Sequence, residues 1–109
     1  MADLLSSSLT AAEPPRELSV PTQALWWLRK GALAMGPEWH KAHALCQSGE
    51  GDRDHDRVHA LAHWIEGDMG NAAYWYRRVG EERAASIDAE WQRIADLLLA
   101  SLTSARGRA

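Results

Sequence analysis

Apolar residues in this chain recur every three or four positions, and no segment alternates apolar and polar residues as an amphipathic strand would. The clearest example lies within residues 58–78, where four apolar residues share one helical face: Val58, Leu61, Ala62 and Ile65. Gly67 and Asp68 interrupt this pattern, and Asp68 can accept hydrogen bonds from the free N–H groups of a second helix. Residues 58–78 are therefore predicted to form a helical hairpin that the rest of the chain covers.

The same spacing predicts about five helices in all. They are expected over 22–30, over 37–47 with Pro37 at the first position, from a cap at Asp52 or Asp54 to Glu66, over 71–79, and from Ile87 to Leu102. The predicted fold class is all-α, with two antiparallel hairpins packed on each other and a C-terminal helix that closes the bundle.

The 109 residues of the chain are enough for one domain with a modest core. Residues 1–20 are rich in Ser, Ala, Glu and Pro, and the pair Pro14–Pro15 cannot lie inside a helix. This segment is therefore expected to be a flexible or loosely docked arm. The helical domain is expected to span 21–103, and the basic segment 104–109 is expected to be a frayed tail.

The net charge of −3 argues against a protein that binds nucleic acid or an anionic membrane, because such a protein would carry a basic patch. No run of about eighteen apolar residues is present, so no transmembrane helix is predicted. The single cysteine, Cys46, rules out an internal disulfide framework and is typical of a reducing compartment. The N-terminal segment lacks the pattern of a signal peptide, so a cytoplasmic location is expected.

The two predicted hairpins share a spacing of large and small residues. Trp39, Ala42 and Cys46 are spaced like Met69, Ala72 and Tyr76, about 30 residues further on. A small alanine at a helix crossing lets two helices approach closely, and the large residue one turn later fills the next gap. The stretch from Gly67 to Tyr76 resembles a tetratricopeptide-type hairpin, and this resemblance implies helix pairs stacked side by side.

A longer string extends from His59 to Tyr76 and reads H-x3-H-x2-E-G-D-x2-N-A-x-Y-W-Y. It resembles a family of small uncharacterised bacterial and fungal proteins. The resemblance implies a shared fold, extends at most to a shared site, and implies no particular reaction.

Candidate chemistry is concentrated around the central hairpin. His59 and His63 lie four residues apart, so both imidazoles project from one side of a helix and can hold a divalent transition metal, with Glu66 as a third ligand. His43 can reach this site from the preceding helix. Past the turn, three residues are candidates for lining the same cleft as ligand-binding groups: Asp68, Asn71 and Tyr74. The zinc-protease motif is absent because Ala60 follows His59.

Two explanations of these histidines stay open on the sequence alone. They either border the core and hydrogen-bond to Glu66 or to the backbone, or they bind a small molecule or a metal ion, with hydrolysis as one use of such a site. The leading functional prediction is a non-enzymatic module that binds a protein partner or itself, because two hairpins leave helix faces uncovered and the chain holds six tryptophans. A homodimer is expected through Trp26 or Trp27 and the apolar face of the last helix.

Overall fold

The structure, a computed structural model, describes residues 9–107 and the side chains of residues 9–100. Within the described residues it contains helices and no strand, which confirms the all-α prediction. The helices are α2 (Val20–Lys30), α3 (Pro37–Gln47), α4 (Arg53–Glu66), α5 (Met69–Val79) and α6 (Ile87–Gly107). None of them is both long enough and apolar enough to cross a membrane.

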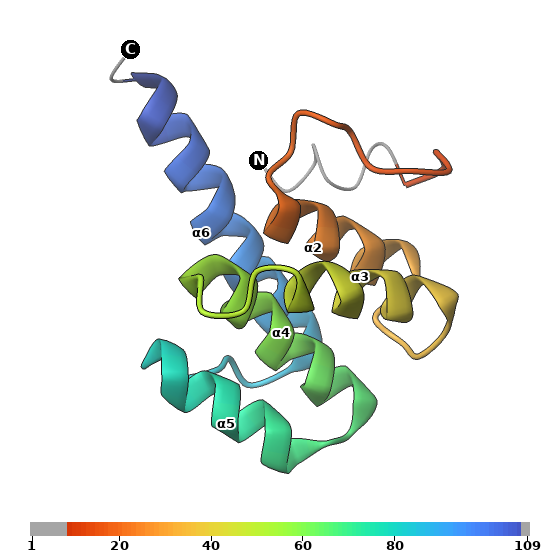
Figure 1. Cartoon of the computed structure of the whole chain (residues 1–109), viewed down its shortest axis with the longest axis vertical. Coiled ribbons are helices and arrows are strands. Elements are labelled where there is room, and N and C mark those ends of the chain that lie inside the picture. Colours follow the sequence, from red (N-terminus) through yellow and green to blue (C-terminus); the bar gives the residue numbers. More distant parts are fainter. Residues whose placement is uncertain (1–8, 108–109) are drawn as a thin grey trace.

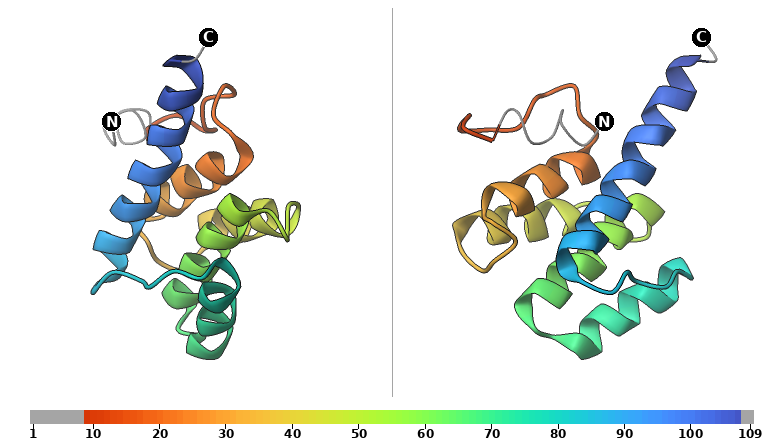
Figure 2. Two further views of the ribbon diagram at one scale, coloured as in Figure 1. Left: turned by 90° about the vertical axis from the view of Figure 1, so that its left-hand side faces the viewer. Right: turned by 180° about the vertical axis from the view of Figure 1, so that it is seen from behind.

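Helix α4 is the centre of the arrangement, because it packs against all four other helices (Figure 1). The hairpin α2–α3 lies on one side of α4, and α5 lies on another side and packs only against α4. Helix α6 passes behind α2 and α4 in Figure 1 and therefore lies in front of them in the view from behind in Figure 2, with its C-terminal end projecting past the other helices. Within the hairpin predicted over residues 58–78, α4 is thus the element that the other helices cover, whereas α5 is covered by α4 alone.

The main core fills the space between α2, α3, α4 and α6. Its largest fully buried side chains include Trp26, Leu61 and Trp91. The indole N–H of Trp91 donates a hydrogen bond of 2.9 Å to the carbonyl of Leu25, which satisfies its polar group inside the core. A smaller cluster between α4 and α5 contains Ala60, Ala72, Trp75 and Tyr76.

Short polar side chains fix where three helices begin. Asp52 caps α4 by accepting from the backbone N–H of His55 at 3.1 Å, and Asp68 caps α5 by accepting from the N–H of Asn71 at 3.2 Å. Both caps were predicted, although α5 begins at Met69, two residues before the predicted start. Helix α2 also begins earlier than predicted, at Val20, with Ser19 as its cap.

The structure describes parts of the expected arm and of the expected tail. The segment 9–19 is docked, because Leu18 is buried and Lys30 Nζ donates to the carbonyls of Leu9 and Ala11 at 2.8 Å. The part of the expected arm over 1–8 lies outside the described residues. Ala32 is exposed in the turn that follows α2. The expected tail is helical as far as Gly107.

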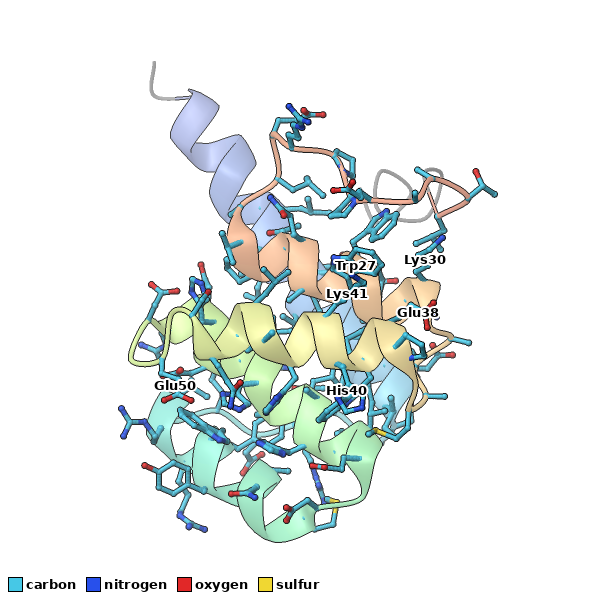
Figure 3. All side chains as sticks on the ribbon, turned by 45° about the vertical axis from the view of Figure 1, so that its right-hand side comes forward. Trp27, Lys30, Glu38, His40, Lys41 and Glu50 are labelled. Carbon is cyan, nitrogen blue, oxygen red and sulfur yellow. The ribbon has the colours of Figure 1, made fainter. Side chains whose placement is uncertain are left out.

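Trp26 offers no surface for the expected homodimer, because its side chain is fully buried. Trp27 is partly buried: its ring meets Trp26 edge to face at 5.0 Å, and Lys41 Nζ lies 5.1 Å from its centre (Figure 3). Trp26 was expected at the surface but is buried, because α2 packs against three helices, α3, α4 and α6, rather than along a single face. The homodimer itself stays a prediction.

A buried carboxylate fixes the segment between α5 and α6. Glu90 is fully buried and accepts from the hydroxyl of Tyr76 at 2.7 Å and from the backbone N–H of Ala84 at 2.8 Å. Arg93 donates to both oxygens of the same carboxylate, at 2.8 and 2.7 Å. Because α5 does not pack directly on α6, this network is one of the main links between these two helices.

Candidate metal centre

Three histidines converge where the α2–α3 hairpin meets the α4–α5 hairpin. His43 comes from α3, and His59 and His63 come from adjacent turns of α4. One ring nitrogen of each histidine lies within 4.8 Å of the corresponding nitrogens of the other two. His59 and His63 are buried, with 2% and 9% of their surface exposed, while His43 is half-buried at the edge of the cluster.

The separation of two of these nitrogens matches a shared metal ion. The Nε2 atoms of His43 and His59 are 3.2 Å apart. Two imidazole nitrogens bound to one tetrahedral Zn²⁺ at about 2.0–2.1 Å are themselves about 3.3–3.4 Å apart. The same 3.2 Å separation also allows an N–H···N hydrogen bond between the two rings while no ion is bound.

Two tryptophans hold the histidine rings in orientation. The indole of Trp39 stacks on His43, with ring centres 4.8 Å apart and planes 10° apart. Its N–H donates to the carbonyl of Ala62 on α4 at 2.8 Å, which fixes the position of the indole. Trp75 of α5 stacks on His59 at 4.2 Å and 23°. Helices α3, α4 and α5 therefore all contribute to the geometry of the cluster.

The surroundings keep two of the imidazoles neutral. Burial lowers the pKa of His59 to about 4, with further lowering from repulsion by His63 and His43. Burial also lowers the pKa of His43, again together with repulsion from His63. The neutral imidazole is the form that binds metal ions. The Nδ1 atom of His59 is buried and has no hydrogen-bond partner, so this ring is only partly satisfied by the protein.

Glu66 lies beside the cluster and contacts one of its members. Its Oε1 atom accepts a hydrogen bond of 2.9 Å from Nδ1 of His63, one turn earlier on α4. Asp68 is also close to His63 and Glu66, with one ligand atom of each within 4.8 Å of the others. The carboxylate of Asp68 is already engaged as the cap of α5, and hydrogen bonds from Asn71 lower its pKa.

The other two predicted ligand-binding residues, Asn71 and Tyr74, make their polar contacts with residues other than the three histidines. The side chain of Asn71 is exposed and donates to Asp68 at 2.7 Å. Tyr74 is 44% exposed, and its hydroxyl accepts from Arg78 at 3.2 Å on the outer face of α5. His55 lies four residues before His59 and so on the same side of α4, but its Nδ1 atom is 2.7 Å from the carboxylate of Asp52. The structure thus brings together His43, His59, His63, Glu66 and Asp68.

Sequence reasoning missed the two tryptophans of the site. Trp39 lies four residues before His43, so helical spacing places the two rings on one side of α3. That spacing was a usable signal, although Trp39 was considered only in the spacing that the two hairpins share. Trp75 carried no such signal, because its contact with His59 depends on how α5 packs against α4.

Comparisons with protein families, curated proteins and solved structures found no match to this chain. The resemblances to tetratricopeptide hairpins and to the small bacterial and fungal family stay predictions from sequence. The geometry of the histidine cluster is accordingly the basis for assigning a function.

Proposed function

We propose that this protein binds a divalent transition metal ion through His43, His59 and His63. The observation that carries the proposal is the convergence of three imidazoles from two helices, with two Nε2 atoms 3.2 Å apart. An ion at this position links the two hairpins, because His43 belongs to the first and the other two ligands belong to the second.

The ligand set determines which ions are suitable. Three imidazole nitrogens suit Zn²⁺, Cu²⁺, Ni²⁺ or Co²⁺, whereas Mg²⁺ and Ca²⁺ prefer oxygen ligands. Three protein ligands leave a fourth tetrahedral position for water or for an added ligand. The half-buried edge of the cluster at His43 is the side from which an ion can enter.

The alternative is a histidine cluster that serves packing alone. Buried polar atoms in proteins are nearly always hydrogen-bonded, and a packing histidine gains most when both ring nitrogens are paired. Here Nε2 of His59 faces a second imidazole instead of a carbonyl or carboxylate. An ion bound between His43 and His59 replaces this weak contact with two coordinate bonds, which supports the metal-binding function.

The test is a titration of metal-free protein with Zn²⁺, followed by calorimetry and by the melting temperature. One equivalent should bind and raise the melting temperature, because an ion that binds only the folded state stabilises it. His43→Ala, His59→Ala and His63→Ala should each weaken binding strongly. His40→Ala is the matched control, since His40 lies exposed on α3 outside the cluster (Figure 3).

Two results would contradict the proposal. The first is the absence of a melting-temperature shift with Zn²⁺, Ni²⁺, Co²⁺ or Cu²⁺. The second is binding that persists in all three histidine variants but disappears in His40→Ala, since the ion would then sit on surface histidines.

Self-association is the second candidate function, and one feature supports it. A groove of about 760 Å³ runs between α5 and the segment that follows it, and Met69 at its edge is 39% exposed. Burial of this apolar edge against a second copy would remove it from water. Sedimentation at several concentrations tests this function: Met69→Glu should shift a dimer toward monomer, and a wild-type protein that stays monomeric throughout would exclude it.

A further inference from the structure

The geometry points to Glu66 as a positioning residue of the proposed metal centre, which holds His63 so that Nε2 rather than Nδ1 is its ligand atom. This inference rests on the proposed metal-binding function. It also changes the role expected from the sequence, where Glu66 was a candidate ligand.

The hydrogen bond between His63 and Glu66 determines which nitrogen is free. A carboxylate can only accept, so Nδ1 of His63 must carry the hydrogen that is donated over 2.9 Å. A neutral imidazole has one N–H and one bare nitrogen, and Nε2 is therefore the bare one. His63 thus offers its Nε2 lone pair to an ion without rearrangement of the ring.

The same contact excludes Glu66 from the coordination sphere. The two nitrogens of an imidazole point away from each other across the ring. An ion bound at about 2.1 Å to Nε2 therefore lies about 7 Å from an oxygen that is hydrogen-bonded to Nδ1 of the same ring. Glu66 can hold His63 or bind the ion, and the observed hydrogen bond selects the first role. A carboxylate behind a ligating histidine also makes the imidazole a stronger donor to the metal.

The test compares Zn²⁺ affinity in wild type, Glu66→Ala and Glu66→Gln, measured by competition with a chelator. Loss of an outer partner of this kind typically costs about 10–100-fold in metal affinity. Glu66→Ala should show this loss. Glu66→Gln should recover part of it, because the amide oxygen can still accept from Nδ1.

Asp52→Asn is the matched control. Asp52 forms the same type of contact with a histidine three residues away on α4, 2.7 Å from Nδ1 of His55, but outside the cluster. Asparagine also caps helices well, so this variant should fold normally. Its Zn²⁺ affinity should equal that of wild type.

The absorption spectrum of bound Co²⁺ distinguishes a positioning residue from a ligand. If Glu66 only positions His63, Glu66→Ala should bind Co²⁺ more weakly but give the wild-type ligand-field spectrum at saturation. A changed spectrum at saturation would overturn the inference, because Glu66 would then be a ligand. Unchanged affinity in Glu66→Ala would also overturn it, while leaving metal binding by the three histidines intact. Failure of the wild-type protein to bind any ion would instead reject the proposed function itself.

Discussion

Replacement of Glu81 by glutamine should destabilise the protein in a way that depends on pH. Glu81 follows the end of α5, and its carboxylate joins two arginines from different helices. Arg57 of α4 donates from Nε at 2.8 Å and forms a second contact through its terminal nitrogen, and Arg93 of α6 donates at 3.0 Å. The side chain of Glu81 is only 17% exposed, so solvent screens these contacts weakly.

The expected size follows from the ionisation of Glu81. Hydrogen bonds from Arg57, followed by those from Arg93, lower the pKa of this carboxyl from 4.5 to about 2. At about 1.4 kcal/mol per pKa unit, this shift corresponds to at most about 3.5 kcal/mol of stabilisation at neutral pH. Glutamine keeps one acceptor oxygen, so we expect Glu81→Gln to lower the free energy of unfolding by about 2 kcal/mol at pH 7.

The pH dependence gives the sharper test. The folded-state pKa lies below the unfolded value, so the stabilisation is complete above the unfolded pKa and is lost as pH falls toward 2. Urea unfolding at pH 7 and pH 3 should therefore show the difference between wild type and Glu81→Gln falling to less than half, about 1 kcal/mol. Glu82→Gln is the matched control, because Glu82 is exposed and has no ion-pair partner among the described residues. Equal unfolding midpoints of wild type and Glu81→Gln at pH 7, or a difference that is the same at pH 3, would refute the reasoning.

Three other predictions concern packing and the metal centre. Ala72→Leu should cost about 1–3 kcal/mol in urea unfolding, because Ala72 is fully buried between α4 and α5; coincident midpoints would show that this contact is loose. Trp39→Phe should lower the free energy of unfolding by about 1 kcal/mol through loss of the hydrogen bond to Ala62, while the remaining ring still stacks on His43 and one equivalent of Zn²⁺ is kept; a loss of stoichiometry would show that stacking alone does not orient His43. Because the pKa values of His59 and His43 are lowered, protons compete with Zn²⁺ for these two ligands only at lower pH. A plot of the logarithm of Zn²⁺ affinity against pH should therefore have a slope well below three between pH 6.5 and pH 5. A slope of three would show that the ion is held by three ordinary imidazoles.

The helices could be predicted from sequence because their signals are local. Apolar spacing, the cap at Asp68 and the first-turn proline at Pro37 each act within a few residues of the element they define. The start of α2 was predicted too late because Pro21 was taken as the residue before the helix. Proline is tolerated throughout the first turn, and Ser19 supplies the cap two residues earlier.

The candidate site was predicted only in part, because its geometry depends on contacts between helices. The pair His59 and His63 follows from spacing within α4. His43 lies on α3, before the turn that leads into α4, so its distance from this pair depends on how α3 packs against α4. Tyr74 was predicted to line the cleft but is exposed, whereas Trp75 and Tyr76 face inward. Tyr74 lies two positions before Tyr76 and is therefore rotated about 200° from it around the helix.

The most direct test of the metal centre is the position of a bound ion. Crystals of the protein grown with one equivalent of Zn²⁺ should give an anomalous scattering peak between α3 and α4. This peak should lie about 2.0–2.1 Å from one ring nitrogen of each of His43, His59 and His63. Glu66 should remain hydrogen-bonded to Nδ1 of His63. A peak at His40 or His55 would contradict the three-histidine site. So would the absence of any peak in data collected at the zinc absorption edge.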